Sequence, residues 1–284
     1  MLRVFTSVLH FRRGQQCLKH DDFGGALFHF SKVLQANPKN YFAYHNRGVA
    51  LQAMGTYASS IEDFDQAIKL NPGNAASHAA RGVSRKFLGD FERAMEDQTR
   101  ALTLDPMHAG IHRELGVLCQ FKGDLDRAIV HLTTAIELAP RDPEGSKLRG
   151  YVQFFRGKFE AAAADLQRAT ELGHDPYAVL FYHLARTRLT GAATEFGVLA
   201  ANLRGGQWPA PVFDLFMGRL SGQGLLEAAA TSHERAEAHF YIGEWHLMRA
   251  DRDAAVSAFK AALQSLPAWF IEHSAAAAEL ARLG

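Results

Sequence analysis

The chain has 284 residues, of which 48% are hydrophobic and 21% are charged, so it has enough apolar content to bury a substantial core. Its 31 basic and 30 acidic residues nearly cancel, which argues against a nucleic-acid-binding protein and against a broad positive field for anionic membranes. Two cysteines are too few for a disulfide framework, and no apolar run reaches the roughly 18 residues of a transmembrane helix.

The first predicted elements form a repeat that is marked by proline. Residues 1–20 are apolar and then basic, the reverse of a secretory signal, so we expect them to begin the first helical unit. Pro38, Pro72, Pro106 and Pro140 are then separated from one another by 34 residues. Aligned on these prolines, five units occupy residues 7–40, 41–74, 75–108, 109–142 and 143–176. Positions within a unit are called slots 1–34 below.

The same residue types recur in the same slots of each unit. Glycine occupies slot 8 in all five units and slot 15 in most of them, and an aromatic or leucine follows at slot 17. Slots 20 and 27 hold small residues, and slot 24 usually holds Phe or Leu. A mid-unit glycine ends one helix, and the proline of the Asn-Pro or Asp-Pro turn ends the next. Each unit is therefore predicted to be a pair of amphipathic helices, and the chain to be all-α.

This 34-residue pattern resembles the tetratricopeptide repeat. The resemblance implies an α-solenoid, a right-handed superhelix of helical hairpins in which stacked units share one continuous core. It also implies that the first helix of each unit lines a concave groove.

The regular phase ends after residue 176. We expect a degenerate sixth unit at 177–203, a helical insert outside the repeat at 204–235, a further unit at 236–269 and a capping helix at 270–284. In the further unit, Gly243, Ala255, Phe259, Ala262 and Pro267 occupy the expected slots.

Residues 177 to 284 also resemble the family of the bacterial outer-membrane lipoprotein NlpI. The matching residues are Trp208-Pro209, Gly218, the segment from Phe240 to Gly243, Ala255, Phe259, Ala262, Glu272-His273 and Glu279-Leu280. This resemblance implies a homodimeric periplasmic adaptor for cell-envelope enzymes. Cys17 follows "RRGQQ" instead of a short apolar signal, so the sequence departs from the lipoprotein pattern there. The sequence as given indicates a cytoplasmic protein. Removal of an export signal would instead indicate periplasmic or outer-membrane association.

No motif indicates catalysis, a metal or a cofactor. Cys17 and Cys119 both fall at slot 11, where a free cysteine is expected in the core. The 14 histidines form no HExxH motif and offer no set of three convergent ligands. We therefore predict that the chain is not an enzyme and holds no metal and no cofactor.

The predicted binding site lies in the groove, where slots 5, 9, 12 and 13 share one helix face. The residues predicted to contact a partner are Lys86, Phe87, Arg113, Gln120, Phe121, Lys147, Tyr151, Phe154 and Phe155. Phe87, Phe121 and Phe155 repeat at slot 13 with basic residues beside them. Such a ladder suits a peptide, because rings bury its apolar side chains and cations meet its carboxylates. Internal packing and self-association are the alternatives for these rings.

The predicted function is a protein-protein interaction scaffold that binds a protein or peptide in the groove. A self-assembling structural repeat protein is the alternative. The slot 7 arginines, Arg13, Arg47, Arg81 and Arg149, each precede glycine in a packed helix, so we expect structural ion pairs from them.

Overall fold

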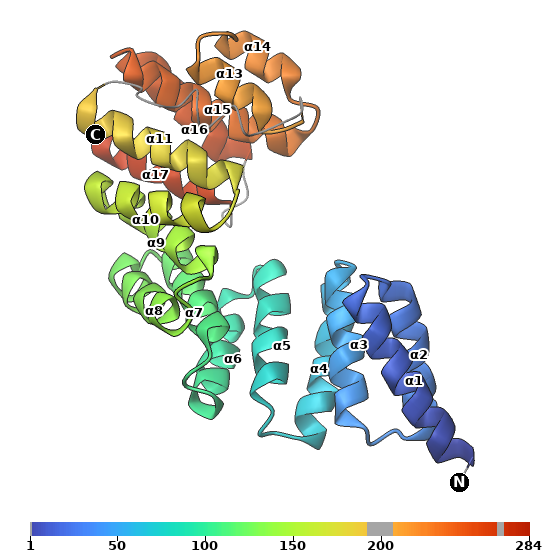
Figure 1. Ribbon diagram of the computed structural model, residues 1–284. Helices are drawn as coiled ribbons and strands as arrows, with labels where there is room; N and C mark the ends of the chain where they lie inside the picture. Colours follow the sequence, from blue (N-terminus) through green and yellow to red (C-terminus); the bar gives the residue numbers. More distant parts are fainter. Residues whose placement is uncertain (1, 192–206, 266–269) are drawn as a thin grey trace. The chain divides into compact units, whose positions relative to one another are not determined.

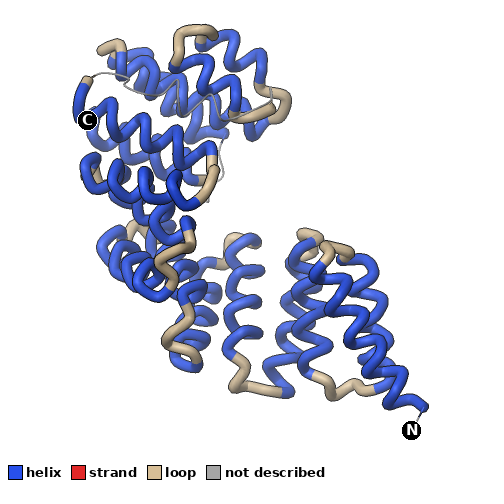
Figure 2. The backbone as a smooth tube through the Cα atoms, viewed as in Figure 1, coloured by secondary structure: helices blue, strands red, loops and turns tan. Residues whose placement is uncertain are grey.

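The computed structural model describes residues 2–191, 207–265 and 270–284, and this part of the chain contains helices and no strand (Figures 1 and 2). In the first half the helices are α1 (Leu2–Lys19), α2 (Phe23–Ala36), α3 (Tyr41–Ala53), α4 (Tyr57–Leu70), α5 (Ala75–Phe87), α6 (Phe91–Leu104), α7 (Ala109–Phe121) and α8 (Leu125–Leu138). The others are α9 (Pro143–Phe155), α10 (Phe159–Leu172), α11 (Pro176–Thr190), α13 (Ala210–Phe216), α14 (Gly222–Ala228), α15 (Ser232–Met248), α16 (Arg252–Ser265) and α17 (Ile271–Leu283). The predicted all-α solenoid of helical hairpins is confirmed.

The chain divides into two compact units, Met1–Leu118 and Cys119–Gly284. In the first unit the pairs α1/α2, α3/α4 and α5/α6 stack in sequence (Figure 1), and the first helices of adjacent pairs contact one another. In the second unit α9/α10 and α15/α16 are the closest pairs. Residues 192–203 of the expected sixth unit, 204–206 of the expected insert and Pro267 lie outside the described residues.

Close approach between the two helices of a pair depends on the glycine at slot 8. A Cβ atom on Gly48 would lie 2.8 Å from the ring of Phe64, and one on Gly150 would lie 2.6 Å from Leu166. Phe64 and Leu166 occupy slot 24 and are fully buried. In the third repeat, residues 75–108, slot 24 is Gln98, whose amide donates a hydrogen bond to the Ala79 carbonyl at 3.0 Å. The large side chain at slot 24 therefore fills the space that glycine leaves.

The turns between successive 34-residue repeats contain the helix caps. The side-chain oxygens of Asn40 and Asn74 accept hydrogen bonds from the backbone amides of Ala43 and Ser77, which satisfies amides that lack a partner within the helix. Within a unit, Gly55 has a φ of +74°, a left-handed conformation that only glycine adopts without strain. These local features explain why the repeat keeps its length.

Ion pairs between slots 7 and 23 hold the helices of most pairs together. Arg47 donates to both carboxylate oxygens of Asp63, at 2.7 and 2.6 Å, and Arg149 donates to Asp165 at 2.7 Å twice. Arg81 forms the same pair with Asp97 and reaches Asp65 of the preceding pair. The predicted structural role is confirmed for these three arginines. In the first pair slot 23 is His29, so Arg13 has no carboxylate at that position.

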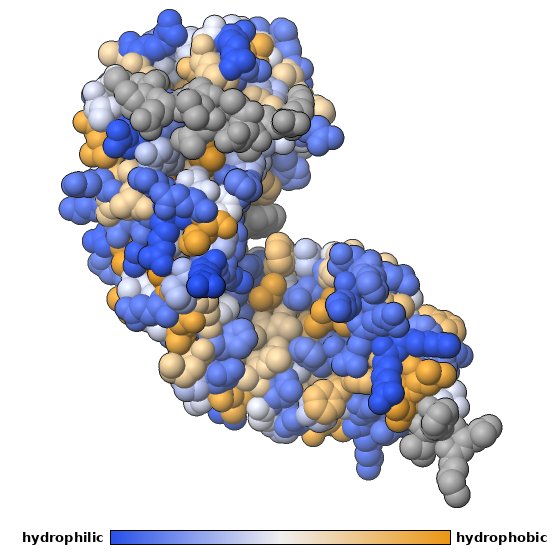
Figure 3. Space-filling model, in the orientation of Figure 1, coloured by the Kyte–Doolittle hydropathy of each residue, from blue (hydrophilic) through white to orange (hydrophobic). Residues whose placement is uncertain are grey.

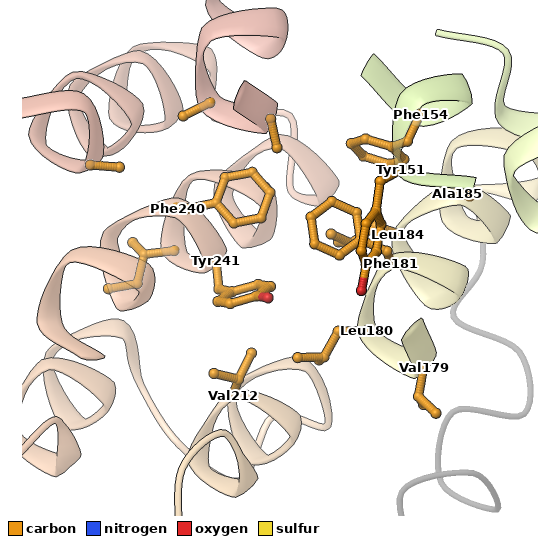
Figure 4. Packing of buried hydrophobic residues seen from close by; sticks show 14 of the residues in the cluster. Tyr151, Phe154, Val179, Leu180, Phe181, Leu184, Ala185, Val212, Phe240 and Tyr241 are labelled. Atoms are coloured by element: carbon orange, nitrogen blue, oxygen red, sulfur yellow. The ribbon is translucent and has the colours of Figure 1, made fainter. Parts of the chain in front are cut away.

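The core of the second unit is aromatic. Phe181, Phe240, Tyr241 and Phe154 are fully buried, and Figure 4 shows the rings of Phe181, Phe240 and Tyr241 pointing toward one another. The helices α13 and α14 contribute Val212, Leu215 and Leu225 to this cluster. Among the described residues, no helix combines the length and the hydropathy that a bilayer crossing requires.

Candidate functional site

The surface of interest is formed by the first helix of each pair. We call it the first-helix face and define it by slots 2, 5, 9, 12 and 13, which point to the same side of the helix. It contains all nine residues predicted to bind a partner.

In the first unit the predicted residues are Lys86, Phe87 and Arg113. The ring of Phe87 is 46% exposed and stacks on Tyr57 with the ring centroids 4.7 Å apart. Lys86 forms a 2.6 Å ion pair with Glu114, and its ammonium lies 5.2 Å from the centroid of the Phe87 ring. Arg113 is half-buried one pair further along. Phe87 is thus accessible to a partner, whereas the charge of Lys86 is neutralised within the chain.

In the second unit the polar members of the predicted site contact other parts of the chain. Gln120 is buried, and its amide lies 3.5 Å from the hydroxyl of Ser274 in α17. Lys147 forms 2.7 Å ion pairs with both Glu144 and Asp175. These hydrogen bonds raise the pKa of Lys147, although burial opposes the rise.

The aromatic members of the second unit lie in the core. Tyr151 and Phe154 are buried and belong to the aromatic cluster that Figure 4 shows, and Phe155 is only 7% exposed. Phe121 is half-buried. The three slot 13 phenylalanines therefore have different surroundings, with Phe87 exposed, Phe121 intermediate and Phe155 buried. In this structure Tyr151, Phe154 and Phe155 have internal partners.

Helices α11 and α17 both contribute to this burial. Tyr151 and Phe154 contact the ring of Phe181 in α11, with centroids 4.7 and 5.3 Å apart, and α17 lies along α9 on the first-helix face of the second unit. α17 contacts α9 and α15 as well as α16, and Figure 1 shows it next to α11. The guanidinium of Arg282 donates to the backbone carbonyls of Phe154 and Phe155, at 3.3 and 3.0 Å. Those carbonyls are at the end of α9, where helix carbonyls lack partners within the helix. The C-terminal helix therefore covers the end of the last pair and also the face that was predicted to bind a partner.

Two buried carboxyl groups, Glu272 of α17 and Glu237 of α15, are close enough for their charges to interact. Glu272 accepts a 3.0 Å hydrogen bond from the Tyr241 hydroxyl, and Glu237 accepts bonds from the Trp208 indole at 2.7 Å and the Tyr177 hydroxyl at 3.2 Å. Burial, together with the nearby charge of Glu237, raises the pKa of Glu272 to about 8. Burial also raises the pKa of Glu237. Both shifts stabilise the protonated carboxyl groups relative to the same groups in water.

A second polar cluster ties α17 to α11 and α15. Arg188 forms ion pairs with Glu244 at 2.6 Å and with Glu279 at 3.3 Å, and Glu279 also pairs with Arg282. Both glutamates are almost fully buried. Removing one partner of such a buried pair leaves an uncompensated charge, which destabilises a fold strongly.

Two exposed apolar side chains of the first unit were not predicted from the slots. Val8 and Phe42, both at slot 2, are each 50% exposed. They line a surface hollow of about 320 Å³ together with Phe11, Arg12 and Gln15 of α1, Ser7, and Asn40 of the following turn. Slot 2 lies one helical turn before slot 5 on the same face, so the spacing that predicted the site could have included it.

The described residues contain no chemistry that points to catalysis. No group of three or more histidine, cysteine or acidic side chains is placed to hold a metal ion there. Burial raises the pKa of both Cys17 and Cys119, which disfavours the reactive thiolate. Burial lowers the pKa of His183 to about 4, so this histidine is neutral. The arrangement offers surfaces for binding.

Comparison with known families agrees with the repeat pattern. Residues 41–74, 75–108 and 120–179 match models described as the tetratricopeptide repeat. The chain contains tetratricopeptide repeats. Proteins with these repeats are generally non-catalytic scaffolds.

Solved structures with the tetratricopeptide fold align with this chain. PilF of Pseudomonas aeruginosa covers 98% of this chain and 100% of its own, with a TM-score of 0.57 and 14% identity. TTC0263, a thermophilic tetratricopeptide protein of Thermus thermophilus, covers 63% and 98%, with a TM-score of 0.55 and 19% identity. MamA from Desulfovibrio magneticus RS-1 covers 59% and 94%, with a TM-score of 0.53 and 19% identity. At these identities the likeness concerns the fold.

Proposed function

We propose that the chain is a non-catalytic scaffold that binds a peptide segment of another protein on the first-helix face of its first unit. The tetratricopeptide repeats support this function class. The observation that carries the proposal is that Val8, Phe42 and Phe87 leave large apolar surfaces exposed on one face. Exposed apolar side chains that gather on one surface are typical of protein interaction sites.

The second unit supplies an internal example of the same kind of contact. There α17 lies on the first-helix face. Its Arg282 donates a hydrogen bond to the Phe154 carbonyl, while its Ser274 and Glu272 accept hydrogen bonds from Gln120 and Tyr241. A helix that lays one face on such a surface is a common mode of peptide recognition. In the described part of the first unit α1, α3 and α5 pack mainly on one another and on the second helices of their own and the preceding pairs, and no further helix lies on them as α17 lies on α9.

Selection of a random 12-residue peptide library on the immobilised chain tests this function. We expect enriched peptides to bind the chain saturably, and Phe87→Ala to weaken them by roughly 2 kcal/mol, about 30-fold, as hot-spot aromatics do. Phe28→Ala is the matched control, because Phe28 is 55% exposed but lies on a second helix. No enrichment, or equal weakening by both variants, would contradict the proposal.

Two narrower functions have their own support. The resemblance of residues 177–284 to the NlpI family supports a role as a homodimeric adaptor for cell-envelope enzymes. Self-assembly, the second candidate, is favoured by Leu9, which is 42% exposed at slot 3, a slot that is buried in the following pairs at Ala43 and Ser77. Light scattering on the chain used for selection tests both, because a monomer at tens of micromolar would exclude homodimerisation and self-assembly alike.

A further inference from the structure

The hollow between α1 and the start of α3 combines an apolar lining with one cationic side chain, Arg12, at its rim. Val8, Phe11 and Phe42 supply the apolar lining, and the ring of Phe11 is fixed by an edge contact with buried Phe30, at 5.7 Å between centroids. Its volume of about 320 Å³ lies near the lower end of ligand pockets, which span about 300–1,000 Å³. This volume suits one or two large side chains of a peptide.

The charge around this hollow differs from that of the rest of the chain. Residues 1–60 contain seven basic and two acidic residues, a net charge of +5, whereas residues 61–284 contain 24 basic and 28 acidic residues, a net charge of −4. The helices α1, α2 and α3 contain no acidic residue at all. The balanced total of the chain therefore conceals a basic N-terminal part. Figure 3 shows hydrophobic and strongly hydrophilic side chains side by side on this part of the surface.

Arg12 on the rim of the hollow lacks the partner that other cations on the same face have. Lys86 is paired with Glu114, and Lys147 with Glu144 and Asp175. Arg12 is exposed and forms no ion pair with any side chain that the structure describes. A guanidinium next to an apolar hollow can form two parallel hydrogen bonds to a carboxylate whose neighbouring side chain fills the hollow.

We propose that this hollow binds an acidic segment of another protein, in which a large apolar side chain enters between Val8, Phe11 and Phe42 while a neighbouring Asp or Glu pairs with Arg12. This inference rests on the proposed function and specifies the chemistry of its partner. The basic charge of residues 1–60 favours a segment with several carboxylates, because complementary fields speed association and suppress basic competitors.

Four fluorescein-labelled 12-residue peptides test the proposal by fluorescence anisotropy with the full chain. The first combines Glu with Leu. In the second Gln replaces Glu, in the third Lys replaces Glu, and in the fourth Ser replaces Leu. We expect the Glu-Leu peptide to bind at least tenfold more tightly than each of the others. Raising the salt concentration should weaken it, since the ion pair with Arg12 is exposed.

Variants of the chain test whether the peptides bind in the hollow beside Arg12. Arg12→Glu should weaken the Glu-Leu peptide at least tenfold and strengthen the Lys-containing peptide, a reversal that unfolding cannot produce. Phe42→Ala should weaken every peptide that contains Leu. The control Arg100→Glu makes the same charge change at an exposed arginine of α6, a second helix, and should leave the order of the four peptides unchanged. Circular dichroism shows whether each variant keeps the helical content of the parent chain.

The outcomes separate this inference from the function beneath it. If library peptides depend on Phe87 but are insensitive to Arg12→Glu and Phe42→Ala, the scaffold function stands and the acidic-segment proposal is wrong. Equal effects of Arg12→Glu and Arg100→Glu would show a diffuse charge effect and would overturn it as well. A dimer in light scattering that Phe42→Ala dissociates would assign the hollow to a second copy of the chain, which is equally contrary to the proposal.

Discussion

The two units present the same slot in opposite surroundings. Phe87 in α5 and Phe155 in α9 both occupy slot 13, but Phe87 is 46% exposed and Phe155 is 7% exposed. Each phenylalanine is the last residue of the first helix of its pair, and both belong to the same repeat pattern. The difference is α17, whose Arg282 binds the carbonyls at the end of α9. A repeat pattern therefore fixes the side to which a residue points, and the rest of the chain decides whether that side is open.

The largest expected effect concerns these two phenylalanines. Phe155→Ala should lower the free energy of unfolding by about 3 kcal/mol, because it removes a buried ring and leaves a cavity. Phe87→Ala should lower it by less than about 1 kcal/mol, as substitutions of exposed side chains usually do. Urea denaturation followed by circular dichroism measures both, because the helices of both units contribute to this signal. Similar losses for the two variants would contradict the difference in burial.

A smaller effect, graded by pH, tests how α17 is held. The pKa of Glu272 is raised from an ordinary value of 4.5 to about 8, so the folded chain keeps a proton that the unfolded chain has lost between these two pH values. The contribution of Glu272 to the free energy of unfolding is complete below its pKa in the unfolded chain and is lost as the pH rises toward 8. The unfolding free energy should fall with rising pH over this window, by up to about 1.4 kcal/mol per pH unit.

Glu272→Gln isolates this contribution. Its side-chain oxygen can still accept the hydrogen bond from Tyr241, but it does not titrate. Glu237, Asp175, Tyr151 and Tyr177 surround the site and remain unchanged. Burial also raises the pKa of Glu244 to about 8, so this group keeps its own contribution in the variant. We expect the variant to show a shallower pH dependence than the parent chain and to be more stable than it at pH 8. Tryptophan fluorescence during urea titrations at pH 5, 6.5 and 8 measures this, and an unchanged slope would contradict burial of Glu272.

Most of the fold could be predicted from local features of the sequence. The slot 8 glycines, the slot 24 side chains and the proline turns act within one pair, so their meaning is the same in each copy. The ion pair between Arg47 and Asp63 spans 16 residues and is likewise repeated within units. These features specify the helices and their pairing without information from the rest of the chain.

The solvent exposure of the candidate site could not be predicted in this way, because it depends on contacts between segments that are distant in the sequence. Arg282 meets the carbonyl of Phe154 across 128 residues, and Gln120 meets Ser274 across 154. No repeat relates these positions. The alanine-rich α17 has no sequence feature that distinguishes a helix at the end of the stack from one lying on its first-helix face. The hollow beside Arg12 was missed for a simpler reason, because the slots considered began at slot 5.

Hydroxyl-radical footprinting of the intact chain, read by mass spectrometry, tests whether the first-helix face is open in the first unit and covered in the second. It measures how fast individual side chains oxidise, and therefore how accessible each is to solvent. We predict that Phe42 and Phe87 oxidise readily, whereas Tyr151, Phe154 and Phe155 are protected. Oxidation of Phe155 and Tyr151 as fast as that of Phe87 would contradict the account, because it would mean that α17 does not cover the first-helix face of the second unit.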